Sequence, residues 1–257
     1  MIRGLYSVAS GLITGEAKQN SIMNNMANLN TTGYKSEKLS IKSFDEVMIS
    51  NRDKYVHGKH VKNNIGTLSN GAEINEKNIN FEQGTIKNTE NDTDFALEGR
   101  GFFVVRRNGQ NLYTRDGHFM VNAQGYLLNQ NGDLVLGRNL SNNAVEPINV
   151  GEGKIASDKL GNLSIDGKLK YKLQLVDFND YKQLKKEGES LYSSKTNPVP
   201  ANNIFVTQKA LEASNVDNVQ VMTEMMSVMR NFESDLKVLK TLDESLGKAV
   251  NDIGRVR

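Results

Sequence analysis

The stretch from Ser214 to Ile253 constrains the fold of this chain more than any other part of the sequence. Its apolar side chains recur three or four residues apart, with one polar interruption at Asp243 and no proline. This spacing predicts a single long α-helix with one apolar seam. The predicted seam consists of Met222, Met225, Met229, Phe232, Leu236, Leu239, Leu246 and Val250. At ~1.5 Å per residue the helix would be roughly 55–60 Å long, so much of the seam needs a partner outside a compact core.

Residues 2–29 predict a second amphipathic helix at the opposite end of the chain. Its seam positions are Leu5, Leu12, Met23 and Met26. Glycines at positions 4, 11 and 15 each weaken an isolated helix by about 1 kcal/mol relative to alanine, which suits a helix that another backbone approaches closely. A loosely ordered terminus is the alternative. We expect the helix to end near Asn28, because Gly33 follows in an Asn-Thr-Thr-Gly segment and can adopt the left-handed conformation that stops a helix.

The two terminal helices are expected to pair, because helices in proteins are stabilised mainly by packing their apolar faces. The predicted fold class is α+β: long N- and C-terminal helices pair as a coiled-coil-like α domain, and a mostly antiparallel β domain is inserted between them. The predicted boundaries are 1–30 and 214–257 for the helical domain, 31–64 for an extended connector and 65–213 for the β-rich domain. Apolar surface left uncovered by such a pair favours association.

The middle of the chain changes to the two-residue period of β-strands. The clearest predicted strand is residues 168–178, where Leu169, Tyr171 and Leu173 alternate with polar side chains. This alternation is typical of a half-buried antiparallel strand. The run from Phe102 to Val105 is apolar throughout and predicts a buried strand.

The composition excludes several classes of protein. Acidic and basic residues nearly balance, with a net charge of +2, so no basic surplus indicates a nucleic-acid or lipid surface. The chain has no cysteine, which excludes disulfides and thiolate metal sites. The N-terminal segment lacks the continuous apolar stretch of a secretory signal peptide, and no segment resembles a membrane span.

No group of residues predicts catalysis. Gly99-Arg100-Gly101 precedes a predicted strand, which does not fit a dinucleotide-binding loop. His57 and His60 have a spacing that can hold a metal on a helix, but Gly58 and the absence of a nearby carboxylate favour a solvated loop. We therefore expect a protein that is not an enzyme, with no catalytic residue, cofactor or metal. An enzyme such as a wall hydrolase is the least favoured alternative.

Three segments, in this order, resemble the bacterial flagellar basal-body rod and hook family. They are SGLITGEAKQNSIMNNMANLNTTGYK, FEQGTIKNTENDTDFALEGRGFFVV with the following LYTRDGHFMVNAQGYLLNQNGDLVLG, and ALEASNVDNVQVMTEMMSVMRNFESDLKVLKTLDESLG. We expect these motif residues to shape helix ends and turns, with Ser214 capping the C-terminal helix. The residues that carry the resemblance are Asn25, Asn28, Thr31, Gly33, Tyr34, Gly99, Gly101, Phe102, Phe103, Tyr113, Thr114, Arg115, Gly117, Leu211, Glu212, Ser214, Asn215 and Val216.

The resemblance implies a structural subunit of the flagellar rod, of the distal or the proximal type. Such a subunit assembles helically through its terminal helices into the torque-transmitting shaft around the export channel. The implied partners are other copies of the chain, neighbouring rod and hook proteins and the flagellar export apparatus, without nucleic acid, small-molecule substrate or direct membrane insertion. The implied location is the basal body outside the cytoplasmic membrane, reached without a cleaved signal peptide. A hook subunit of the same family and a low-copy exported coiled-coil cap or scaffold are the alternatives.

Overall fold

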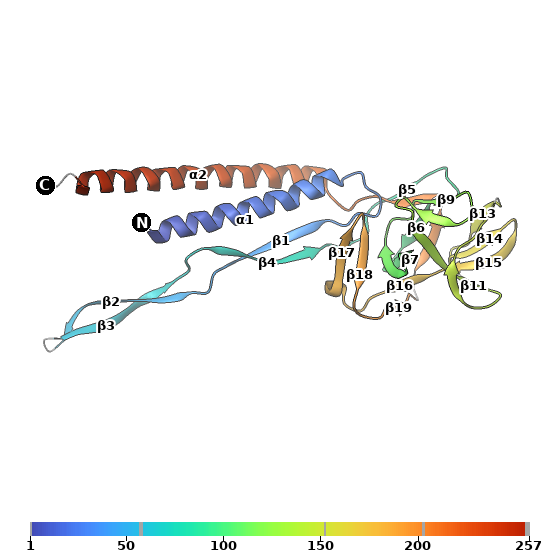
Figure 1. Cartoon of the computed structure of the whole chain (residues 1–257), viewed down its shortest axis with the longest axis horizontal. Coiled ribbons are helices and arrows are strands. Elements are labelled where there is room, and N and C mark those ends of the chain that lie inside the picture. The colour runs from blue at the N-terminus through green and yellow to red at the C-terminus, as the bar shows by residue number, and fades with distance from the viewer. Residues whose placement is uncertain (1, 57–58, 152, 202–203, 255–257) are drawn as a thin grey trace. The chain divides into compact units, whose positions relative to one another are not determined.

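The computed structural model describes residues 2–56, 59–151, 153–201 and 204–254 (Figure 1). The chain is divided into two compact units, each built from segments that are distant in sequence. The first, which we call the helical unit, comprises Met1–Met26, Glu37–Asn78 and Asn218–Arg257. The second, the β unit, comprises Ala27–Ser36 and Ile79–Asp217.

In the helical unit, α1 (Ile2–Ala27) and α2 (Asn218–Gly254) lie side by side (Figure 1). A Cβ atom placed on Gly4 would lie 3.8 Å from Leu242 Cδ1, and one on Gly15 would lie 3.7 Å from Phe232 Cδ2. The facing position on α2 moves toward its start as α1 advances, so the two helices are antiparallel. The glycines of α1 thus leave room for the larger side chains of α2.

The residues of α2 that are covered within the chain only partly match the predicted seam. Every second residue of the covered row lies one position before the corresponding residue of the seam. The covered row consists of buried or half-buried side chains in alternating steps of four and three, namely Val221, Met225, Val228, Phe232, Asp235, Leu239, Leu242, Leu246 and Ala249. Met225, Phe232, Leu239 and Leu246 are common to this row and to the predicted seam. The other seam members lie one residue further along and are exposed.

The predicted fold class is wrong. Strands make up 42 % of the part of the chain that the structure describes, and the helices do not form a separate coiled-coil domain, because they share their unit with strands. A coiled coil would bury both alternating positions of the seam, yet Met222 and Met229 are 48 % and 46 % exposed and Val250 is 69 % exposed. The physical reason is that the covered row runs through Val228, Asp235 and Leu242, so that Met229, Leu236 and the other seam members one residue further along face outward.

The strands of the helical unit form two ribbons that sequence periodicity did not predict. Strand β1 (Glu37–Ser43) pairs with β4 (Ala72–Ile79), and β2 (Val47–Val56) pairs antiparallel with β3 (Lys59–Leu68). Polar and apolar side chains are exposed along both ribbons, so no buried face imposes a two-residue alternation. The histidine pair considered above includes His57, which lies outside the described residues.

The β unit is built on one large antiparallel sheet with two smaller strand pairs. Along the main path the strand order is β13-β14-β15-β11-β7-β8-β18-β17, and β6 with β20 and β5 with β21 form the small pairs. The strands and the short helix η1 are β5 (Ile86–Asn88), β6 (Phe95–Glu98), β7 (Phe102–Arg107), β8 (Gln110–Thr114), β9 (Phe119–Val121), β10 (Leu127–Asn129), β11 (Leu134–Asn139), β12 (Val145–Pro147), β13 (Ile155–Ser157), β14 (Asn162–Ile165), β15 (Lys168–Leu173), β16 (Leu175–Asp177), η1 (Tyr181–Gln183), β17 (Leu184–Gly188), β18 (Leu191–Ser194), β19 (Val199–Pro200), β20 (Phe205–Gln208) and β21 (Ala210–Glu212).

Strand β7 separates two apolar cores. Phe103 and Val105 point into a larger core of aliphatic side chains, and Phe102 and Val104 point into a smaller, mainly aromatic core on the other face. This explains why the strand is apolar at every position, as the sequence predicted. The predicted strand at residues 168–178 is also confirmed, although it is divided into β15 and β16.

Candidate assembly site: a buried polar junction and an exposed helical face

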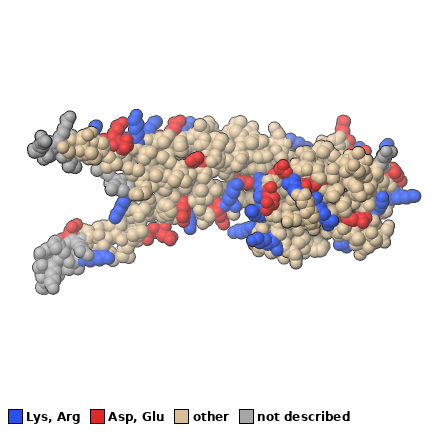
Figure 2. All heavy atoms as spheres, in the orientation of Figure 1, with Lys and Arg blue, Asp and Glu red and all other residues tan. Residues whose placement is uncertain are grey.

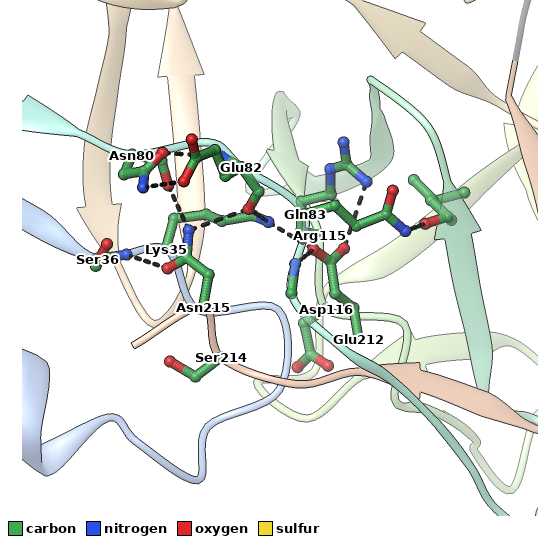
Figure 3. Close-up of polar contacts among 12 residues, drawn as sticks. Lys35, Ser36, Asn80, Glu82, Gln83, Arg115, Asp116, Glu212, Ser214 and Asn215 are labelled. Atoms are coloured by element: carbon green, nitrogen blue, oxygen red, sulfur yellow. Dashed lines mark hydrogen bonds and ion pairs between the residues drawn. The ribbon is translucent and has the colours of Figure 1, made fainter. Parts of the chain in front are cut away.

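A buried ion pair joins the segment that follows α1 to the segment that precedes α2 (Figure 3). Lys35 Nζ lies 2.5 Å from Glu212 Oε1 and donates a hydrogen bond to the Glu82 carbonyl oxygen at 2.7 Å. Lys35 and Glu212 are 0 % and 1 % exposed. Burial lowers the pKa of the Lys35 ammonium, and the neighbouring Glu212 carboxylate opposes that change.

Arg115 is the second cation at the same carboxylate. Its Nη1 lies 3.4 Å from Glu212 Oε2, and its Nη2 donates to the Gly99 carbonyl oxygen at 2.6 Å. The backbone N–H of Gly84 donates to Glu212 Oε1 at 2.9 Å. Glu212 therefore binds two cations and one backbone amide, which offsets the cost of removing its charge from water.

Asn215 extends the junction toward the start of α2. Its side-chain oxygen accepts a hydrogen bond from the Ser36 N–H at 2.8 Å, and its Nδ2 donates to the carbonyl oxygens of Asn80 and Glu82 at 2.8 and 3.0 Å. One amide side chain thus satisfies backbone groups of two separate segments. We call the group formed by Lys35, Arg115, Glu212 and Asn215 the polar junction.

Gly33 permits the turn that leads into the polar junction. Its φ of +65° is left-handed, and its N–H donates to the Glu212 carbonyl oxygen at 2.8 Å. A Cβ on Gly33 would lie 2.3 Å from the Asp116 backbone nitrogen, so no larger residue fits. Thr32 donates to Asp116 Oδ1 at 2.6 Å. Burial raises the pKa of the Asp116 carboxyl, although hydrogen bonds from Thr32 and the His118 backbone act in the opposite direction.

Other motif residues lie at helix ends and in the cores. In the helical unit, the Asn25 side-chain amide donates to the Glu37 carbonyl oxygen at 2.8 Å and accepts from the Glu37 N–H at 2.9 Å. It thus bonds both backbone groups of Glu37, as a residue of a neighbouring strand does. Thr31 donates to Asn28 Oδ1 at 3.1 Å just after α1 ends. Ser214 does not cap α2, which begins at Asn218; its hydroxyl instead accepts a hydrogen bond from the Val216 N–H at 3.3 Å.

The remaining motif residues have packing roles in the β unit. Tyr34 is buried, and the Lys186 ammonium lies 4.1 Å from the centre of its ring. Gly101 and Gly117 leave no space for a Cβ beside Ile204 and the Phe95 carbonyl oxygen. Phe102 and Tyr113 belong to the smaller, mainly aromatic core, and Phe103 belongs to the larger core. Leu211 in β21 pairs with Lys87. Thr114 donates a hydrogen bond to the Ser190 carbonyl oxygen at 3.0 Å.

The sequence did not predict that Lys35, Arg115 and Glu212 meet. Each lies in a different motif, and their separation along the chain gives no pairing signal. Each of the three motifs contributes one charged residue to the polar junction. Asn80, Glu82 and Gly84 complete the polar junction through backbone groups, whose partners no local sequence pattern predicts.

The helical unit exposes part of the predicted seam. Met222, Met229 and Val250 lie on the outer surface of α2, and Leu236 is 43 % exposed. On α1, Leu5, Leu12 and Met26 are half-buried, whereas Met23 is exposed. Charged side chains of both signs are scattered over the visible face of the molecule, with broad uncharged areas between them (Figure 2).

The charged side chains of the polar junction hold parts of the β unit together. The charges of the polar junction are buried and paired, and no described group of three or more His, Asp or Glu side chains is placed to hold a metal ion. Neither described helix is long and apolar enough to span a membrane. Long helices with exposed apolar side chains, as in the helical unit, are typical of the class of subunits that assemble with other chains.

Comparison with known proteins identifies the family. Residues 5–35 match the model of the flagella basal body rod protein, residues 96–169 that of the flagellar hook protein FlgE/F/G D1 domain, and residues 207–252 that of the flagellar basal body rod FlgEFG protein C-terminal region. The chain is 32 % identical to the flagellar basal-body rod protein FlgF of Caulobacter vibrioides and 30 % identical to the flagellar hook-basal body complex protein FlhO of Bacillus subtilis, over the full length of each. It is also 30 % identical to the rod protein FlgG of Bacillus subtilis, with 98 % of this chain and 99 % of that protein covered.

The chain therefore belongs to the flagellar basal-body rod protein family. Members of this family are structural components of the flagellar basal body, and the expected family is confirmed.

Proposed function

We propose that this chain is a self-assembling subunit of the flagellar rod, the shaft that transmits torque around the export channel. Copies leave the cytoplasm unfolded through the flagellar export apparatus and pack outside the cytoplasmic membrane through their terminal helices. Other rod and hook proteins contact the two ends of the assembly that these copies form.

One observation supports this proposal more than the others. Along α2 a row of apolar side chains remains exposed after the chain's own helix and ribbons have packed, and it includes Met222, Met229 and Leu236. A large exposed apolar row on a soluble chain is a site of association. Methionine suits a helix that meets several neighbours, because its side chain is flexible and polarisable.

Leu236→Asp tests this proposal. Because Leu236 is exposed within the chain, the variant is expected to fold with little change in stability. In an assembled shaft the aspartate would be buried without a partner, at a cost of about 3–5 kcal/mol. We expect the variant to be nearly absent from purified basal bodies and the cells to lose motility.

Ser234→Asp is the matched control, since Ser234 is also exposed but lies on another side of α2. This control variant is expected to be incorporated. Quantitative mass spectrometry of basal bodies measures both variants, and wild-type levels of Leu236→Asp in the particle would refute the proposal.

A further inference from the structure

The face of α1 that points away from α2 carries an apolar groove. Arg3, Tyr6, Ala9, Ser10 and Ile13 of α1 line it, together with Phe44 and Asn70. Tyr6 and Ile13 are 70 % and 64 % exposed. At about 100° per residue these positions lie roughly half a turn from Gly4, Gly11 and Gly15, the side that faces α2. The groove thus lies on a second face of α1, where Tyr6 and Ile13 stay exposed and Ser10 packs against the ribbon at Gly71.

The geometry of the groove suits one side chain of another helix. Tyr6, Ala9, Ser10 and Ile13 are spaced i, i+3, i+4 and i+7, the four positions that surround an inserted side chain when two helices pack. The small residues in the middle leave space for it. The ribbon holds the groove in place, because the Ala72 N–H donates to Ser10 Oγ at 3.1 Å.

We propose that this groove receives the methionine face of α2 from a neighbouring copy of the chain. We define the methionine face as Val219, Met222, Met226 and Met229, whose exposed side chains repeat in steps of three and four. Met226 then inserts between Tyr6 and Ile13, with Met229 and Met222 at the two ends. The inference rests on the proposed function, which it extends by assigning the surfaces that meet.

Charge complementarity supports this occupant and its direction. Arg3 lies at one end of the groove, and Glu233 continues the methionine face one step beyond Met229. In an antiparallel arrangement Arg3 faces Glu233 when Met226 is centred on the groove. Copies that point the same way along a polymer necessarily present α1 and a neighbour's α2 antiparallel, because the two helices are antiparallel within each chain.

The methionine face cannot fill the groove of its own chain. Gly4 faces Leu242 and Gly15 faces Phe232, so the groove lies beside the part of α2 that follows Phe232. The methionine face lies about three turns away along the helix axis. A groove and a complementary row at different places on one unit form a heterologous contact, which generates an open helical polymer when the rotation between copies does not close a ring.

Engineered cysteines test the contact directly, because the natural chain contains none. The double variant Tyr6→Cys/Met229→Cys is produced at full length in flagellated cells, and purified hook–basal bodies are oxidised and separated on a non-reducing gel. We expect a ladder of cross-linked dimers and larger multimers. Tyr6→Cys/Ser227→Cys is the control and is expected to give no ladder, because Ser227 is exposed about 160° from Met229 around α2.

The outcomes separate this inference from the proposed function. Absence of the unaltered chain from basal bodies overturns both. Presence of the Tyr6→Cys/Met229→Cys variant at the wild-type level without a ladder, or with the same ladder as the control, overturns the inference alone.

Exchanging the charges of Arg3 and Glu233 tests the same contact independently if the cysteine variants are not incorporated into basal bodies. Arg3→Glu and Glu233→Arg are each expected to lower the number of copies per basal body severalfold, and the double variant is expected to restore it. A double variant that is no better than the single variants overturns the inference.

Discussion

At the scale of single residues, the polar junction places three charged side chains where water is excluded. Lys35 and Arg115 share the Glu212 carboxylate away from water. Glu212→Gln keeps the shape of the side chain but leaves two cations without a counter-charge. Breaking a buried pair in this way is expected to lower the free energy of unfolding by about 3–5 kcal/mol, measured by denaturant titration.

Asp92→Asn is the control for that change. Asp92 lies 2.9 Å from Lys209 in an ion pair whose side chains are both about half exposed. Such a pair is expected to contribute less than about 1 kcal/mol. Equal destabilisation by the two variants would contradict the assignment of a special role to the buried pair.

Substitutions at Gly33 and Gly132 distinguish the cost of backbone strain from the cost of a steric clash. Gly33→Ala and Gly132→Ala both place a side chain at positive φ, which costs about 1–2 kcal/mol. A Cβ at Gly132 meets open space, whereas one at Gly33 would lie 2.3 Å from the Asp116 backbone nitrogen. Thermal unfolding is expected to show an additional loss of at least about 2 kcal/mol for Gly33→Ala. Indistinguishable variants would contradict this account of the turn.

Asp116 makes stability depend on pH. Its folded-state pKa is raised above 3.8 by burial, so the folded state holds the proton more tightly than the unfolded state does. Its contribution to stability is therefore present below pH 3.8 and is lost as pH rises through the raised pKa. Asp116→Asn is expected to give a flatter dependence of unfolding free energy on pH in this interval. A slope equal to that of the wild type, measured by denaturant titrations, would contradict the pKa shift.

At the scale of secondary-structure elements, the glycines of α1 are adapted to the side chains of α2. In Gly15→Leu the added side chain meets Phe232, while nothing lies within 4 Å of a Cβ on Gly247. Gly247→Leu is expected to stabilise α2 by about 0.5–1 kcal/mol through helix propensity. Gly15→Leu is expected to lower the melting temperature of the helical signal in circular dichroism. A rise in both variants would show that α1 and α2 do not pack closely there.

The elements that could be predicted from the sequence are those with one buried face. Strands β7 and β15 were predicted because burial imposes an apolar pattern on them. The ribbons β1–β4 and β2–β3 were not predicted, because their faces are largely exposed. The apolar positions of α2 are compatible with two overlapping rows of side chains. The row that is covered within the chain contains the charged Asp235 beside Gly11, so the sequence pattern favoured the other row.

The candidate site could be predicted only in part. Motif residues such as Gly33 and Glu212 were recognised, but the ion pair that joins Glu212 to Lys35 and Arg115 depends on tertiary structure that no local pattern encodes. The methionines of α2 were recognised as packing residues, yet which neighbour covers them depends on the other molecules present. That partner stays a proposal.

At the scale of the whole molecule, the chain combines two units with different tasks. The β unit contains both apolar cores and the polar junction. The helical unit leaves apolar side chains exposed on α1 and α2. We expect assembly to complete the packing of the helical unit, while the β unit changes little.

Counting this chain in isolated hook–basal bodies is the most direct test of its role as a rod subunit. Quantitative mass spectrometry gives the number of copies per particle, and antibody labelling locates them along the shaft. The account predicts several copies at one defined level of the rod. Absence from the particle, or a single copy at its tip, would contradict assembly of this chain into the shaft.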